Sequence, residues 1–306
     1  MMAGSRLRFW GAALAASVVL SGCTIDTIDT IDTTESLRPP TSTVTLTSTP
    51  TSPPAAEAPV LPTEEPQQGE SFAQALQAAV DQTIAVYGGT AGIAVSDGST
   101  EVTAGDMSAA AAWSTIKVPL AIAAVRQDPA QTTNVTAAIQ WSDNNAAEAL
   151  WASLGTPEQA GQATTDILRE GRNDVTVNTV VTRDGFSSFG QTMWSPADQA
   201  RFAATLGCIR GSEPVLQNMA MVEPGQSWGI GQLPGARFKG GWGPQPDGAY
   251  SVRQFGLSTD PTSGQTTALA MIVRPGSGSF ADAQAMADTL ISTVQPALTQ
   301  APSAAC

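Results

Sequence analysis

Residues 114–125 read Ser-Thr-Ile-Lys-Val-Pro-Leu-Ala-Ile-Ala-Ala-Val, an apolar segment that contains one of the only two lysines in the chain. Three residues is close to one helical turn, so Ser114 and Lys117 are expected on the same face of a helix over 114–127. Apolar neighbours strip water from a lysine and lower its pKa toward the neutral amine. The chain has no histidine, so an activated serine needs another base, and an unprotonated lysine can serve.

Two further short motifs follow in the chain. Ser-Asp-Asn occupies 142–144, and the second lysine opens Lys-Gly-Gly at 239–241. Each motif alone has an ordinary explanation: a surface lysine on an amphipathic helix, a turn or helix cap, and a glycine turn. The order of all three in one chain makes a shared chemical role the stronger hypothesis.

The spacing of apolar residues predicts the elements around these motifs. Helices are expected over 71–87, 114–127, 134–154 with an interruption near 142, 157–169, 195–206 and 279–298. Strands are expected over 90–95, 100–103, 237–242, 250–257 and 266–273, the first two forming a hairpin. This order predicts an α+β fold in which terminal helices flank an antiparallel sheet and an all-helical subdomain is inserted.

In this order, Ser-Thr-Ile-Lys, Trp-Ser-Asp-Asn and Phe-Lys-Gly-Gly resemble the three signature elements of class A β-lactamases and penicillin-binding proteins. The similarity extends over about residues 70–300. It implies a β-lactamase/transpeptidase-like fold and a D,D-peptidase-like or β-lactamase-like serine hydrolase that needs no cofactor. The substrate class would be a β-lactam or a peptidoglycan stem peptide.

The resemblance assigns a role to each motif residue. Ser114 would attack the carbonyl carbon, and Lys117 would take the serine proton. Ser142 would pass a proton to the leaving nitrogen, and Asn144 would hold Lys117 and the substrate amide. Lys239 would hold Ser142 and attract the substrate carboxylate.

The third motif departs from the family, which has a hydroxyl residue where this chain has Gly240. That hydroxyl normally helps to bind the substrate carboxylate, and Arg253 on the next strand is the expected substitute, unless it is simply a surface arginine. Gly241 and Trp242 are expected to bind substrate along the strand. The backbone N–H groups of Ser114 and Trp242 would form the oxyanion hole.

Deacylation is the doubtful step. Class A β-lactamases carry a glutamate that activates the deacylating water, on a loop before the helix that here begins at Ser195. The corresponding stretch, 175–194, contains Asp184 but no glutamate, and Glu170 lies further upstream. An acyl-enzyme on Ser114 is therefore expected to be released slowly. Two alternatives stay open: a non-catalytic cell-wall-binding lipoprotein that keeps the fold, and an esterase that uses the same Ser-Lys pair.

Residues 1–69 lie outside this domain. Residues 1–23 resemble a lipoprotein signal peptide whose lipobox ends at Cys23; an ordinary secretory signal is the alternative. Residues 24–69 are rich in Thr, Ser and Pro and are expected to be a disordered tether for the domain at 70–306. Lipidation at Cys23 would anchor the protein to the outer face of the bacterial plasma membrane.

Net charge restricts the kinds of partner that the protein can bind. The formal net charge of -13 argues against nucleic acid and against electrostatic docking on anionic lipid. We expect a monomer. In an exported protein Cys208 and Cys306 can form a disulfide, with two free thiols as the alternative, and they do not make a metal site.

Tryptophan is frequent near the motifs. These residues could line a cleft or pack in the core, and the sequence leaves both readings open: Trp113, Trp141, Trp194, Trp228 and Trp242.

Overall fold

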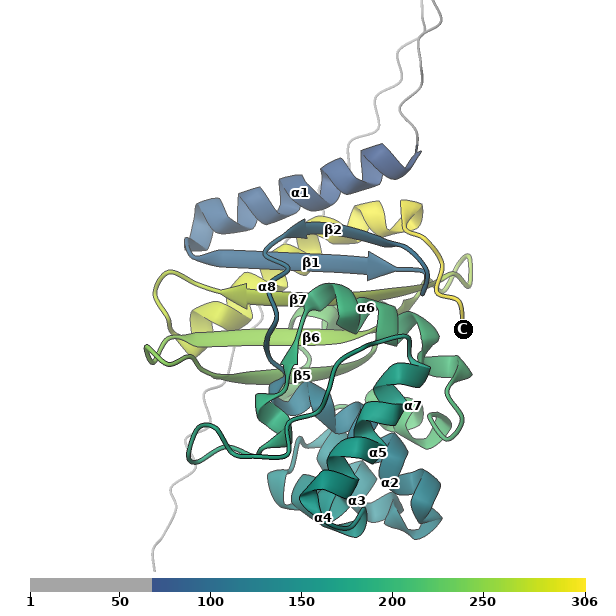
Figure 1. Cartoon of the computed structure of the whole chain (residues 1–306). Coiled ribbons are helices and arrows are strands. Elements are labelled where there is room, and N and C mark those ends of the chain that lie inside the picture. The colour runs from purple at the N-terminus through teal and green to yellow at the C-terminus, as the bar shows by residue number, and fades with distance from the viewer. Residues whose placement is uncertain (1–67) are drawn as a thin grey trace, which may run out of the picture. The chain divides into compact units, whose positions relative to one another are not determined.

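A five-stranded antiparallel sheet organises the computed structural model, which describes residues 68–306. The strand order is β2-β1-β7-β6-β5, so the first hairpin lies at one edge and β5 at the other (Figure 1). The strands are β1 (Thr90–Ser96), β2 (Glu101–Gly105), β5 (Arg237–Pro244), β6 (Tyr250–Thr259) and β7 (Thr266–Arg274). A separate two-stranded ribbon pairs β3 (Ala110–Ala111) with β4 (Met193–Trp194).

Eight α-helices surround the sheet within this part of the chain. They are α1 (Gln68–Tyr87), α2 (Lys117–Gln127), α3 (Thr132–Gln140), α4 (Asn144–Ser153), α5 (Pro157–Glu170), α6 (Pro196–Thr205), α7 (Glu213–Met219) and α8 (Phe280–Val294). The predicted α+β class and the flanking terminal helices are confirmed. The expected helix over 134–154 is two helices, α3 and α4, separated at 141–143.

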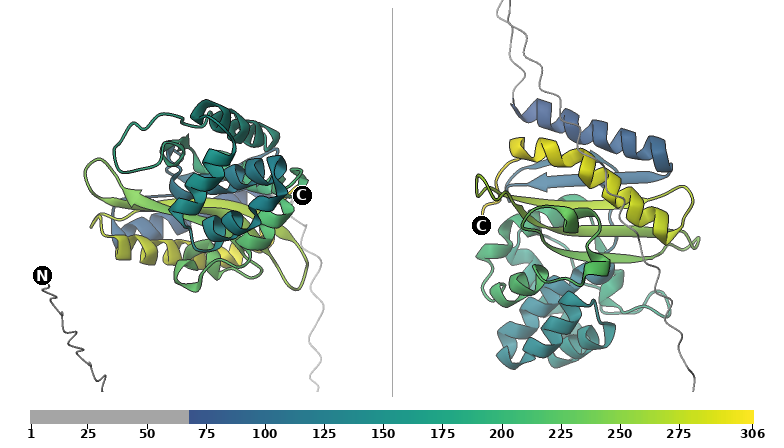
Figure 2. Two further views of the ribbon diagram at one scale, coloured as in Figure 1. Left: turned by 90° about the horizontal axis from the view of Figure 1, so that it is seen from below. Right: turned by 180° about the vertical axis from the view of Figure 1, so that it is seen from behind.

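Strand alternation divides the core between the two faces of the sheet. In β7, Leu269, Met271 and Val273 face the terminal helices α1 and α8, whereas Ala268 and Ala270 belong to the core on the opposite side. Successive side chains of a strand point to opposite faces, so one strand supplies both cores. Figure 2 shows α1 and α8 on the same face of the sheet, with the helical subdomain on the other side.

The helical subdomain is built around α2, whose residues from Lys117 to Val125 are all buried. Two other helices, α5 and α6, begin at well-defined N-terminal caps. Thr156 and Gln159 form a capping box at the start of α5, and the Ser195 hydroxyl accepts the Asp198 N–H at the start of α6. These caps satisfy backbone donors that a helix start would otherwise leave unpaired.

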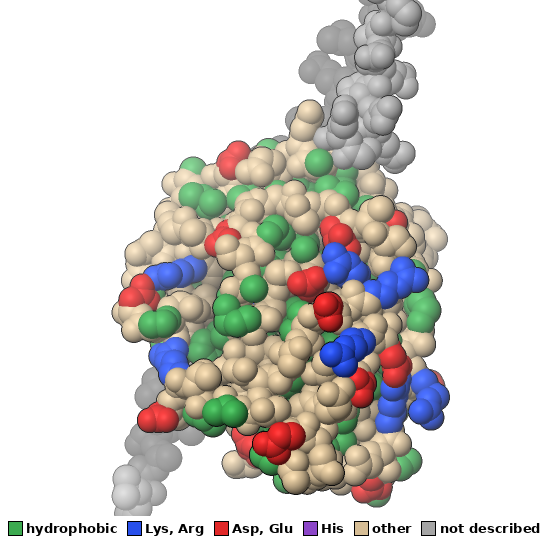
Figure 3. All heavy atoms as spheres, in the orientation of Figure 1, with side chains coloured by type: hydrophobic (Ala, Val, Ile, Leu, Met, Phe, Trp, Pro, Cys, Tyr) green, Lys and Arg blue, Asp and Glu red, His purple; other side chains and the backbone are tan. Residues whose placement is uncertain are grey.

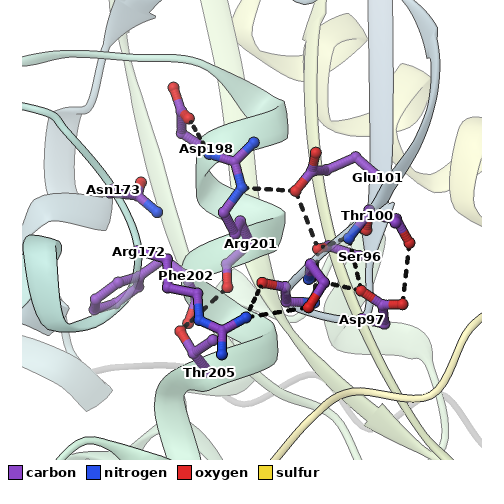
Figure 4. A network of polar contacts seen from close by, with 12 residues as sticks. Ser96, Asp97, Thr100, Glu101, Arg172, Asn173, Asp198, Arg201, Phe202 and Thr205 are labelled. Carbon is purple, nitrogen blue, oxygen red and sulfur yellow. Dashed lines mark hydrogen bonds and ion pairs between the residues drawn. The ribbon is translucent and has the colours of Figure 1, made fainter.

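A polar network fixes α6 against the β1–β2 hairpin (Figure 4). Arg201 donates to Glu101 at 2.7 Å and to Asp198 at 2.8 Å, and these carboxylates raise the pKa of Arg201. Beside it, Arg172 donates to the Gly98 carbonyl at 2.8 Å. The hairpin turn, predicted from Asp97-Gly98, is closed by the Asp97 carboxylate, which accepts from the Thr100 N–H at 2.7 Å.

The predictions for the N-terminal region lie almost entirely outside the described residues. The lipoprotein signal at 1–23, the lipidation of Cys23 and the tether at 24–69 are not covered, except that α1 already begins at Gln68. Across residues 68–306, none of the helices has the length and apolar character required to cross a bilayer. On the face drawn in Figure 3, acidic and basic side chains are interspersed among neutral ones.

A disulfide between Cys208 and Cys306 joins the C-terminus to the end of α6, with the two Cα atoms 5.5 Å apart. The cysteines are separated by 98 residues in sequence. A cross-link that closes so long a loop stabilises the fold chiefly by restricting the unfolded chain.

We predict that replacing both cysteines by serine lowers the free energy of unfolding by about 2–4 kcal/mol. Urea denaturation of the domain, monitored by circular dichroism, measures this difference. An unchanged midpoint in the double variant, together with free thiols detected in the parent protein, would contradict the pairing.

Candidate active site

The turn that carries Ser114 is held in a rare backbone conformation. A short 3-10 helix, η1 (Trp113–Ile116), precedes α2, and Trp113 has a φ of 49°. A bulky residue rarely takes a positive φ, and such strain concentrates at functional sites. Strand β5 passes so close that a Cβ atom at Gly241 would lie 2.9 Å from the Ser114 nitrogen. Glycine is therefore required at 241, and it brings the β5 backbone alongside the Ser114 N–H.

The Ser-Asp-Asn motif forms the junction between α3 and α4. Ser142 has a φ of 58°, and the Asp143 carboxylate caps α4 by accepting the Ala146 N–H at 2.7 Å. Asn144 is the first residue of α4. The cap and the left-handed serine together turn both Ser142 and Asn144 toward Lys117.

Lys117 is buried and is surrounded by oxygen acceptors. Its Nζ donates to the Ser142 carbonyl and to Asn144 Oδ1, both at 2.7 Å, and to the Asp143 carbonyl at 3.3 Å. The Ser142 hydroxyl oxygen lies 3.5 Å away. In this state the hydrogen bonds of Lys117 go to the α3–α4 junction rather than to the Ser114 hydroxyl, which lines the same cavity. Catalytic hydrogen bonds commonly tighten only when substrate is bound.

Lys239 contacts the Ser142 hydroxyl from the interior of the protein. Its side chain has no exposed surface, and Nζ donates to Ser142 Oγ at 2.9 Å and to the Gly240 carbonyl at 3.1 Å. The Ser142 hydroxyl is therefore in contact with both lysines. The sequence predicted this grouping, and the structure brings Ser114, Lys117, Ser142, Asn144 and Lys239 together.

Burial lowers the pKa of both lysines. Desolvation lowers the pKa of Lys117 to about 8, against the opposing attraction of the Asp143 and Glu148 carboxylates. Desolvation lowers the pKa of Lys239 well below its usual value, and repulsion from Lys117 adds to the effect. The lowered pKa of Lys117 lets part of the population carry an uncharged amine at neutral pH, and that amine can accept a proton.

The site around Ser114 and Lys117 opens on a cavity of about 310 Å³. One wall is Ser114, Lys117, Ser142 and Asn144, and the facing wall is the loop at 185–190. Arg183 holds this loop against the end of β5, because its guanidinium donates to the carbonyl of Pro244 and lies 4.6 Å from the centre of the Phe186 ring. Trp113 and Trp242 also line the cavity.

The structure adds one residue that the sequence interpretation overlooked. Glu148 lines the cavity, and desolvation raises its pKa while Lys117 opposes the shift. The carboxylates considered from sequence were Asp184, within 175–194, and Glu170 upstream of it. A four-residue spacing would have identified Glu148, since it lies one helical turn after Asn144 on α4.

The expectation for Arg253 is wrong. Its side chain is completely buried, and its donors are used inside the protein rather than facing the cavity. The guanidinium donates to Gln199 Oε1 at 2.7 Å, to the Trp194 carbonyl at 2.7 Å and to the carbonyls of Ala110 and Ala111. The β3–β4 ribbon and α6 cover this strand position, so Arg253 cannot hold a substrate carboxylate.

Arg253 instead supports the turn that carries Ser114. Gln199, which accepts from Arg253, donates to the Thr115 hydroxyl at 2.8 Å. Thr115 follows Ser114 directly and donates in turn to the Ala112 carbonyl at 2.5 Å. A buried chain of hydrogen bonds thus runs from β6 to η1.

The sequence left open whether the tryptophans line a cleft or pack in the core: Trp113 and Trp242 line the cavity, two others are in the core, and Trp141 does neither. Trp194 is fully buried and donates to Asn173 at 2.7 Å, and Trp228 packs beside Trp242 in the core. Trp141 is 57% exposed. A Cβ at Gly240 would lie 3.4 Å from the Trp228 ring, so this indole fills the space beside the altered third motif.

A larger cavity of about 400 Å³ lies near the β6–β7 turn and the C-terminal end of α8. Its one ionisable lining residue is Asp260, whose carboxylate is held by the N–H groups of Thr262 and Ser263. The Ser263 hydroxyl donates to this carboxylate at 3.1 Å, but the hydrogen bonds to Asp260 lower its pKa and make it a weak base. The smaller cavity is therefore the candidate active site.

Solved structures resemble this domain closely in fold. A class A β-lactamase from Bacteroides cellulosilyticus superposes with a TM-score of 0.61 at 17% identity, covering 74% of this chain and 98% of its own. The TLA-3 extended-spectrum β-lactamase gives 0.60 at 14% identity, covering 74% and 99%. A β-lactamase from Streptosporangium roseum gives 0.57 at 18% identity, covering 74% and 98%. No family model matches the chain, and no curated protein matches its sequence.

The chain therefore has the β-lactamase-like fold that its motifs predicted. At identities this low, the similarity establishes the fold alone, and the reaction has to be argued from the side chains of the site.

We predict that Arg253→Met lowers the free energy of unfolding by about 3–5 kcal/mol, because it leaves buried carbonyls without donors. Urea denaturation measures the loss, and Arg237→Met, at an exposed position on β5, is the matched control. Full stability of Arg253→Met combined with selective loss of carboxylate-bearing ligands would restore the substrate-binding role.

Proposed function

We propose that this protein is an exported serine hydrolase that forms an acyl-enzyme on Ser114 with β-lactams or peptidoglycan stem peptides. One observation carries the proposal. Ser114, Lys117, Ser142 and Asn144 line a single cavity, and both lysines contact the same serine hydroxyl. A purely structural role gives no reason to bury two amines behind a nucleophile candidate, because desolvating charge costs stability.

Acylation follows from this arrangement. The Ser114 oxygen attacks the carbonyl carbon while its proton passes to the uncharged amine of Lys117. The Ser142 hydroxyl, in reach of Lys117 at 3.5 Å and of Lys239 at 2.9 Å, gives a proton to the leaving nitrogen and regains one from Lys117. The carbonyl oxygen gains negative charge beside the backbone N–H groups of Ser114 and Trp242, which we assign as the oxyanion hole.

Asn144 is the side chain that we assign to substrate binding. Asn144 holds Lys117 through its side-chain oxygen, which leaves its amide nitrogen free to bind a substrate carbonyl. Lys239 is fully buried and its pKa is lowered, so we assign it to holding the Ser142 hydroxyl rather than to binding a substrate carboxylate. Arg253 takes no part in binding substrate.

Export and anchoring belong to the same proposal. The basic residues, apolar segment and Cys23 at the N-terminus support lipidation, and the Thr-, Ser- and Pro-rich stretch that follows supports a tether. Such a protein would act as a monomer on the outer face of the plasma membrane, where peptidoglycan is the available polymer.

We predict that a fluorescent penicillin adds to the protein with one-to-one stoichiometry and that Ser114→Ala abolishes the adduct. Intact-mass spectrometry at successive times measures formation and loss. Ser187→Ala, which removes a different hydroxyl lining the cavity, is the matched control and should keep the adduct. Absence of any adduct in the parent protein would favour a cell-wall-binding module, and turnover of simple esters alone would favour an esterase.

We predict that the acylation rate rises about tenfold per pH unit below pH 8 and levels off above it. The direction follows from the base: Lys117 must be uncharged, and its pKa is lowered to about 8. Stopped-flow measurement of adduct formation between pH 6 and pH 9 tests this. Lys117→Ala should lower the rate by a factor of about 100 or more and abolish the slope. A flat profile in the parent protein would exclude Lys117 as the base.

A further inference from the structure

The cavity contains one carboxylate that the acylation step does not use. Its ionisable lining side chains are Lys117 and Glu148, and the facing loop at 185–190 contributes none. Glu170, considered from sequence, pairs with Arg126 instead. Asp184 precedes the lining loop and is exposed. Glu148 is therefore the carboxylate that the described residues offer to a molecule bound at Ser114.

Helix geometry places Glu148 in the same wall as the catalytic amine. Asn144 and Glu148 are four residues apart on α4, so their side chains lie one above the other on one face. The hydrogen bond from Lys117 Nζ to Asn144 Oδ1, at 2.7 Å, fixes that face toward the cavity. The next turn of the same face then carries the Glu148 carboxylate, close enough for it and Lys117 to interact electrostatically.

The environment of Glu148 suits a base. Desolvation raises its pKa, so the carboxylate binds a proton more strongly than an exposed one, while the attraction of Lys117 favours the charged form. The Glu148 side chain is exposed, so a water molecule in the cavity can reach its carboxylate.

We propose that Glu148 is the general base that activates water to hydrolyse the acyl-enzyme on Ser114, supplying from α4 the carboxylate that the loop at 175–194 lacks. The inference rests on the proposed function, since it needs an ester at Ser114. It concerns a different step, the release of the acyl group.

The step balances with water as the only co-reactant. Glu148 takes one proton from water as the water oxygen bonds to the ester carbon. The tetrahedral intermediate then breaks its bond to Ser114 Oγ, and that oxygen takes up the proton that Glu148 removed from water, relayed by the uncharged amine of Lys117. The products are the free carboxylic acid and the serine hydroxyl, and Glu148 is a carboxylate again.

The test is Glu148→Gln, which keeps the size and shape of the side chain and removes the basic oxygen. Glu158→Gln is the matched control, because Glu158 is an exposed glutamate at the start of α5, in the same helical subdomain. Intact-mass spectrometry after a pulse of penicillin measures acylation and deacylation separately. Thermal unfolding of both variants checks that the fold is unchanged.

We expect the acylation rate of Glu148→Gln to stay within about threefold of the parent, while deacylation slows by a factor of about 100 to 10,000. Glu158→Gln should match the parent in both steps. Equal deacylation rates in Glu148→Gln and the parent would overturn the inference and leave the acyl-enzyme intact. So would a variant that is slowed in acylation only, because Glu148 would then act through Lys117. Absence of an adduct in the parent would overturn the proposed function itself.

Discussion

Burial of two amines on either side of one hydroxyl is the constraint on which the rest of the site depends. Lys117 and Lys239 both contact Ser142, and neither keeps more than 2% of its surface exposed. Unpaired ammonium groups are costly in such a place, so the fold surrounds Lys117 with oxygens and leaves its pKa near 8. The burial that costs stability is therefore also the feature that lowers the pKa of Lys117 and suits it to act as a base.

Rigid support for this arrangement comes from outside the cavity. Arg253, Gln199 and Thr115 form a buried chain of hydrogen bonds from the central sheet to the nucleophile turn. The positive φ values of Trp113 and Ser142 persist because β5 and the cap of α4 hold both segments in place. Function and stability therefore share residues, and a substitution at Arg253 is expected to disturb catalysis only by loosening the frame.

The sequence predicted the fold well because apolar periodicity and motif order are local signals. The grouping of Ser114, Lys117, Ser142 and Lys239 was predicted from the resemblance of the three motifs to class A β-lactamases and penicillin-binding proteins, because no local pattern joins residues so far apart in sequence. The sequence could not predict that Arg253 is covered, because strand alternation identifies a face and not the backbone carbonyls that approach it from β3 and β4. The position of the loop at 185–190 likewise depends on a contact between Arg183 and Pro244, 61 residues apart in sequence.

The scarcity of lysine has a consequence for covalent labelling. The chain has two ε-amines, and both lie inside the domain. The surface of residues 68–306 consequently offers amine-directed reagents no exposed lysine to compete with the cavity. Lys117, with a pKa near 8 and a place in the cavity wall, is nucleophilic at mild pH. A small amine-directed reagent that enters the cavity would therefore find Lys117 as the one lysine to modify on the accessible surface of residues 68–306.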